Sequence, residues 1–66
     1  MRRPKLILQA DQALIEIAAF RDATRGDYWQ KAEEAWYLLN ACRQKLICSL
    51  TLNEELVLEE LKRKPE

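Results

Sequence analysis

The sequence predicts an all-α fold: an antiparallel helical hairpin with a shorter third helix, in a single domain that spans residues 1–66. Two ladders of mostly small and apolar residues recur at alternating steps of four and three, which places each ladder on one stripe of an α-helix. The first ladder is Leu6, Ala10, Ala13, Ile17, Phe20 and Thr24, and the second is Tyr28, Ala32, Ala35, Leu39, Cys42 and Leu46. The only glycine, Gly26, separates the ladders, and both prolines lie near the chain ends, so no other strong helix breaker interrupts them.

The first helix is predicted over residues 5–25, because Pro4 suits the first turn of a helix and Gly26 follows the last position of the ladder. A second apolar patch, which consists of Leu8, Ile15 and Ala19, points to the far side of this helix. The surface helix of a self-sufficient monomer needs only one apolar face. The patch therefore predicts a second contact, and we expect a homodimer that uses it.

The second helix is predicted over residues 28–47, with Asp27 capping the free backbone amides and Gln30 completing a capping box. Trp29 and Trp36 lie one heptad apart along an edge of its apolar arc. They are interpreted either as core residues that the third helix or the N-terminal segment covers, or as aromatic anchors for a partner, since tryptophan is enriched at binding hot spots.

Arg43 falls within the same apolar arc, and Arg21 occupies the matching place in the first helix. The Arg43 side chain is expected to lay its stem along the core and send its charge to solvent or to a glutamate of the third helix. The alternative is an interface arginine whose carboxylate partner belongs to another chain.

The two predicted helices resemble each other when they are offset by 22 residues. The matching pairs are Ala10/Ala32, Ala13/Ala35, Ile17/Leu39, Ala19/Ala41 and Arg21/Arg43. The resemblance indicates either an internal duplication or two helices that converged on similar residues because they pack together. In both cases we expect the alanine rungs of the ladders at the closest approach of the two helices.

The third helix is predicted over residues 52–64, where Thr51 and Glu54 form a capping-box pattern and Asn53 is a rival cap. The segment 49–52 alternates polar and apolar residues and is predicted as a connection, with a short extended piece as the alternative. Together the segments give a three-helix bundle, with dimerisation into a larger bundle as an open alternative.

The composition argues against catalysis and against cofactors. The chain has no histidine, its two cysteines lack the partners that a zinc site needs, and one glycine cannot build a phosphate-binding loop. We therefore expect no enzyme activity, no metal and no cofactor. No apolar run reaches the length of a membrane span, there is no signal-peptide pattern, and the cysteines form no disulfide framework, so we expect a cytoplasmic protein.

Charge favours no particular class of partner, because eleven basic and eleven acidic residues cancel. The leading hypothesis is a non-enzymatic protein–protein interaction module, acting as a regulator, inhibitor or adaptor, that self-associates and binds another protein. Its candidate interface residues are Leu8, Ile15, Ala19, Trp29, Trp36 and Arg43. The alternative is a small nucleic-acid-binding regulator that clamps phosphates with its basic ends, Arg2, Arg3, Lys5, Lys62, Arg63 and Lys64.

Overall fold

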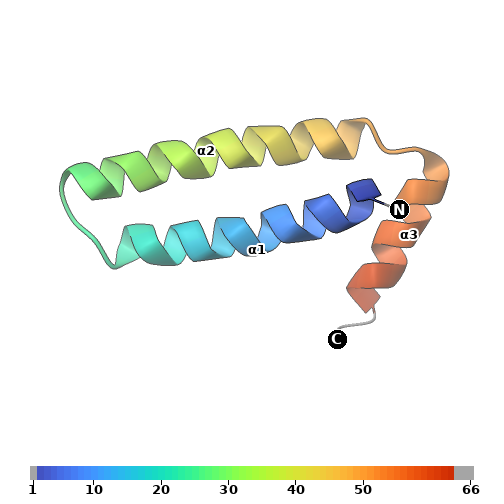
Figure 1. The fold of residues 1–66 in the computed structure, drawn as a ribbon, viewed down its shortest axis with the longest axis horizontal. Coiled ribbons are helices and arrows are strands. Elements are labelled where there is room, and N and C mark those ends of the chain that lie inside the picture. The colour runs from blue at the N-terminus through green and yellow to red at the C-terminus, as the bar shows by residue number, and fades with distance from the viewer. Residues whose placement is uncertain (1, 64–66) are drawn as a thin grey trace.

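Three helices account for most of residues 2–63, the part of the chain that the computed structural model describes (without the side chain of Arg2). They are α1 (Arg2–Asp22), α2 (Asp27–Cys48) and α3 (Leu52–Arg63). No strand occurs within residues 2–63, so the all-α prediction is confirmed for the described residues. Helices α1 and α2 pack closely and run antiparallel, and α3 crosses one end of this hairpin (Figure 1).

The loop between α1 and α2 is longer than the sequence predicted. Helix α1 ends at Asp22, not near Arg25, which leaves residues 23–26 for the connection. Two antiparallel helices lie about 8–10 Å apart, and a connection of several residues spans that gap more easily than a single glycine. Gly26 precedes α2 with φ 68° and ψ −137°, a conformation that side-chain-bearing residues rarely adopt.

The predicted cap at the start of α2 is wrong. Asp27 is already the first helical residue, and Gly26 occupies the capping position without a side-chain hydrogen bond. The Gly26 carbonyl accepts the first bonds of the helix, from the backbone N–H groups of Trp29 and Gln30. Asp27 still lies in the first turn, where a negative charge interacts favourably with the helix dipole.

Helix α1 begins earlier than predicted, at Arg2, which makes Pro4 its third residue. Proline fits there because the first four N–H groups of a helix have no partner within it. The Pro4 ring is almost fully buried. The start of α1 is therefore anchored by packing as well as by backbone geometry.

The capping box predicted at the start of α3 is confirmed. The backbone N–H of Thr51 donates to Glu54 Oε1 over 2.9 Å, and the backbone N–H of Glu54 donates to Thr51 Oγ1 over 3.2 Å. Asn53, the rival cap, lies inside the helix. Ser49 and Leu50 form a turn and its continuation, so the segment before α3 is a connection with no extended strand.

Helix α3 packs against α1 and, within the described residues, makes no comparable contact with α2. It therefore extends one end of the hairpin instead of completing the predicted three-helix bundle. Arg3 joins the elements there: its Nη1 donates to the Ser49 carbonyl over 2.8 Å, and its Nε lies 3.2 Å from Glu54 Oε2. The buried apolar side chains gather mainly along α1, at Ile7, Ala10 and Leu14, with Ala32 from α2 and Leu58 from α3.

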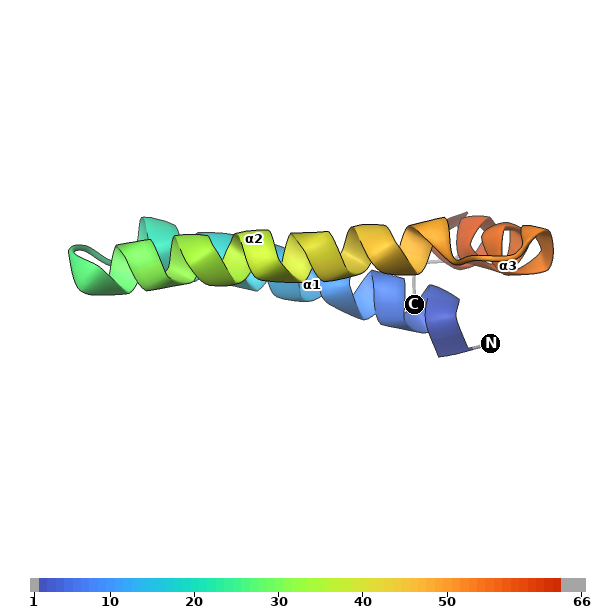
Figure 2. The ribbon, with the colours of Figure 1, turned by 90° about the horizontal axis from the view of Figure 1, so that it is seen from above.

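The molecule is a single layer of helices. Its principal extents are 43 × 25 × 13 Å, and Figure 2 shows how thin it is when seen from above. The radius of gyration is 13.8 Å, whereas a compact chain of this length has one of about 10.8 Å. Domains are normally built from two or more packed layers that share a core. Within residues 2–63, no further layer covers either broad side of this hairpin.

Candidate protein-binding surface

The two ladders face one broad side of the hairpin, and only their edge at Ala10 and Ala32 reaches the seam between its helices. Of the alanine rungs, Ala10 and Ala32 are buried, Ala13 is half-buried and Ala35 is exposed. The most buried large residues of α1 are Ile7 and Leu14, which lie just beside the first ladder. The burial that the prediction expects at the alanine rungs is therefore found at Ala10 and Ala32 and not at Ala35, because the seam is rotated toward Ile7 and Leu14.

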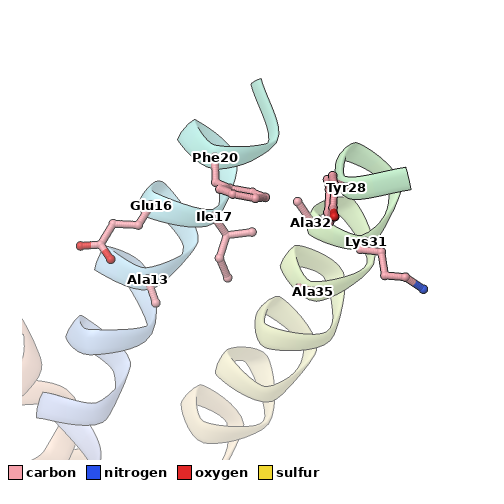
Figure 3. Close-up of a pocket in the computed structure, with 8 residues that line it drawn as sticks. All are labelled: Ala13, Glu16, Ile17, Phe20, Tyr28, Lys31, Ala32 and Ala35. Carbon is pink, nitrogen blue, oxygen red and sulfur yellow. The ribbon is translucent and has the colours of Figure 1, made fainter. Parts of the chain in front are cut away.

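The ladders line two grooves on this side, here called the groove side. The loop groove lies next to the α1–α2 connection and has a volume of about 410 Å³. Its lining residues are Ala13, Glu16, Ile17 and Phe20 from α1, and Tyr28, Lys31, Ala32 and Ala35 from α2. Figure 3 shows Phe20 and Ile17 directed toward α2, with the charged ends of Glu16 and Lys31 pointing away from the groove.

The terminal groove lies nearer the N-terminal end of α1 and has a volume of about 420 Å³. Its lining residues are Leu6, Gln9, Ala10 and Ala13 from α1, and Leu39, Cys42 and Leu46 from α2. None of these side chains is charged. Ala13 lines both grooves, so the groove side carries one almost continuous apolar strip along the hairpin.

The two grooves are related by the 22-residue offset of the sequence. Adding 22 to the four α1 residues of the terminal groove gives Tyr28, Lys31, Ala32 and Ala35, all of which line the loop groove. Subtracting 22 from Leu39 and Cys42 gives Ile17 and Phe20, which also line it. An antiparallel helix pair with matching residues has a local twofold axis perpendicular to its plane. The groove side therefore has approximate internal twofold symmetry.

The opposite side of the hairpin, here called the ion-pair side, shows the same relation. Arg21 of α1 pairs with Glu33 of α2, with 2.6 Å between Nη1 and Oε1. Arg43 of α2 pairs with Asp11 of α1. Adding 22 to Arg21 gives Arg43, and subtracting 22 from Glu33 gives Asp11, so each ion pair is the 22-residue counterpart of the other. The hydrogen bond to Glu33 holds the pKa of Arg21 above its ordinary value, so this guanidinium stays charged.

The pairing of Arg43 settles its intrachain environment. Its carboxylate partner within the chain is Asp11 of α1, where the sequence predicted solvent or a glutamate of the third helix. The side chain is about four-fifths buried, as the stem-along-the-core interpretation expects. The assignment of Arg43 to an interface with another chain stays a prediction.

Three of the remaining sequence-predicted interface residues, Leu8, Ile15 and Ala19, lie on the ion-pair side of α1. A helix turns about 100° per residue, so Ile15 shares a side with Asp11, whereas Trp29 and Trp36 are the 22-residue counterparts of Ile7 and Leu14 and have the direction of the seam. Ile15 is 64% exposed and Trp29 is 40% exposed. On the ion-pair side Ala19 is exposed and Leu8 is half-buried, and Trp36 is half-buried in the direction of the seam.

Trp36 contacts Tyr37, which is not among the sequence-predicted interface residues. Its ring packs edge-on against Tyr37, with 5.3 Å between ring centroids and 84° between ring planes. Tyr37 is 61% exposed. It lies four residues after Glu33 and so belongs to the ion-pair side. The 22-residue offset predicts this placement from the sequence, because Tyr37 is the counterpart of Ile15.

Of the basic ends, the structure describes the side chains of Arg3, Lys5, Lys62 and Arg63. Arg3 is paired with Glu54 and with the Ser49 carbonyl, although 44% of its side chain is exposed, and Lys5, Lys62 and Arg63 are exposed as well. The side chain of Arg2 and all of Lys64 lie outside the described residues.

Glu54 is the one charged residue among the buried side chains of the described range. Its hydrogen bond from the Thr51 backbone N–H lowers the pKa of its carboxyl group, and the positive charge of Arg3 lowers it further. Its function is structural: it caps α3 and ties it to α1.

Residues 2–63 contain no group of three or more cysteine, aspartate and glutamate side chains placed to hold a metal ion. In the same range, no helix combines the length and the apolar character that crossing a bilayer requires. Comparison of the chain with protein-family models, curated proteins and solved structures finds no match. The surface described above therefore carries the functional argument.

Proposed function

We propose that this protein is a non-enzymatic interaction module that acts as a regulator, inhibitor or adaptor by binding another protein. The observation that carries the proposal is the single-layer fold, in which large apolar side chains remain exposed on both broad sides. Soluble monomers rarely expose extended apolar patches, and such patches mark interaction sites. A protein partner supplies the second layer that the hairpin lacks.

The ion-pair side is the proposed surface for the foreign partner. Ile15 and Tyr37 offer exposed apolar area there, and the Arg21–Glu33 and Arg43–Asp11 pairs lie on either side of them along the hairpin. Such a mixture resembles the anatomy of transient interfaces, where aromatic and arginine residues are enriched and bulk hydrophobicity is ordinary. The apolar residues supply binding energy, and the charged groups select the partner.

Two other classes of function have less support. A pocket for a small molecule normally buries 70% or more, roughly, of its ligand, whereas a groove between two helices covers the ligand from one side only. Catalysis needs reactive groups that are free to meet a substrate. The most buried charged side chains described above, Glu54, Arg21 and Arg43, are instead engaged with partners in the chain.

The nucleic-acid alternative is weakened by the position of Arg3, which is committed to Glu54 and Ser49. The unpaired thiols of Cys42 and Cys48 suit a reducing compartment, and we propose the cytoplasm.

The test is affinity capture from the native cell with three baits: the unmodified chain, Ile15→Glu, and Leu56→Glu as a matched control. Leu56 is as exposed as Ile15 but lies on α3, away from the proposed surface. We expect specific proteins with the unmodified and control baits and their loss with Ile15→Glu. Identical capture by all three baits would contradict the proposed surface. Nucleic acid that copurifies at low salt and is released at high salt would favour the alternative.

A further inference from the structure

The groove side differs in chemistry from the ion-pair side and suits a different partner. We propose that it is covered by a second copy of this chain, which places two hairpins face to face in a four-helix bundle. The inference deepens the proposed function, since it assumes a protein that works through its exposed apolar sides. It assigns self-association to the grooves and not to the patch of Leu8, Ile15 and Ala19.

The first argument is the amount of exposed surface. The chain exposes 5314 Å², whereas a compact monomer of 7.8 kDa exposes about 4,400 Å². The excess of roughly 900 Å² is close to the area of about 800 Å² that each partner buries in a standard protein interface. One partner of similar size, laid along the hairpin, accounts for the excess.

The second argument is symmetry. A twofold dimer needs a surface that is complementary to itself, because both copies use the same patch. The groove side has approximate internal twofold symmetry, so it presents a similar profile in either direction along the hairpin. A large residue that projects from one copy therefore meets a groove of the other at both ends of the contact. A foreign partner gains nothing from this repetition, whereas a second copy gains two equivalent contacts.

The third argument is chemistry. The strip between the helices is floored by alanines and bordered by larger apolar side chains such as Phe20, Tyr28 and Leu39. Small residues let a facing helix approach, and large ones fill the space between layers, as in the core of a four-helix bundle. The charged ends of Glu16 and Lys31 point outward (Figure 3), so pairing does not bury them. The ion-pair side, in contrast, carries four charged groups whose burial would cost desolvation energy.

The experiment compares two substitutions of the same type in the same helix. Ala35 lines the loop groove, whereas Ala41, also exposed, lies about 120° away around α2 and lines neither groove. Ala35→Glu and Ala41→Glu carry the same helix propensity and the same charge change. Circular dichroism verifies that both variants fold, and sedimentation equilibrium measures the dissociation constant of the dimer.

We expect a dimer at micromolar concentrations for the unmodified chain and for Ala41→Glu. Ala35→Glu should raise the dissociation constant by about 100-fold or more, because each dimer would bury two unpaired carboxylates. Phe20→Gln, at an exposed position of the same groove, is a second variant and should weaken the dimer in the same direction.

Two results would overturn the inference. One is a monomeric unmodified chain at high micromolar concentration. The other is a dimer that Ile15→Glu dissociates while Ala35→Glu leaves it intact, which would return self-association to the patch on the ion-pair side. Neither result depends on capture of a foreign protein, so the inference and the proposed function can fail separately.

Discussion

Replacing isoleucine by valine at two positions of α1 tests which side of this helix is buried. Ile7 has no exposed surface, whereas Ile15, eight residues later in the same helix, is 64% exposed. Each substitution removes one methylene group and introduces the same helix propensity, so the difference between them reports burial alone. A methylene that is fully buried contributes about 0.8 kcal/mol by transfer, and the cavity it leaves adds to the loss.

We expect Ile7→Val to lower the free energy of unfolding by about 1 kcal/mol, and Ile15→Val by about 0.3 kcal/mol, since only about a third of its side chain is removed from water. A chain of this length has a total stability of about 3–10 kcal/mol, so both changes are measurable. The assay is urea denaturation followed by circular dichroism at low protein concentration. Equal losses at the two positions, or a larger loss at Ile15, would refute the assignment of the core.

Three further predictions concern the loop and the start of α3. Gly26→Ala should lower the thermal midpoint, because the positive φ of 68° strains any side-chain-bearing residue even though no atom lies within 4 Å of the added Cβ; an unchanged midpoint would mean that the loop adopts another conformation. Thr51→Ala should cost about 1 kcal/mol through loss of the cap, whereas Asn53→Ala should cost little, and denaturation separates the two. The lowered pKa of Glu54 means that its stabilising effect is fully present above the ordinary glutamate pKa of about 4.3 and is lost as the pH falls through the folded-state value. Thermal unfolding of Glu54→Gln should therefore depend less on pH in the acid range than that of the unmodified chain, and parallel profiles would contradict the structural function of this carboxylate.

The sequence predicts those parts of the fold that depend on local chemistry. The capping box of Thr51 and Glu54 is visible because both partners lie three residues apart, and the helical ladders are visible because their spacing repeats. The cap at Asp27 fails for a physical reason as well. Gly26 adopts a conformation that other residues rarely reach and takes the capping position itself, so the helix begins at Asp27, one position earlier than a cap at Asp27 allows.

The rotation of the seam cannot be predicted from the ladders alone. Ile7 and Leu14 border the first ladder, and only the packing of α2 and α3 decides that they are more buried than Phe20 or Ala13. The sequence pattern therefore identifies an apolar arc without saying which part of it is covered.

The ion pairs could be anticipated only in part. Two matching pairs at the 22-residue offset are visible in the sequence. One is basic, Arg21 and Arg43, and the other is acidic, Asp11 and Glu33. What the sequence lacks is the register of the hairpin, which places each arginine beside the carboxylate of the other helix.

The most direct test of the central claim, that the groove side is an interface between copies, is thiol labelling at increasing protein concentration. Cys42 lines the terminal groove, whereas Cys48 lies outside both grooves, and both thiols are exposed in the single chain. Mass spectrometry measures the rate at which each cysteine reacts with iodoacetamide. We predict that the rate at Cys42 falls as the concentration rises and that the rate at Cys48 stays constant. A constant ratio of the two rates, over a concentration range in which sedimentation shows a dimer, would contradict the claim.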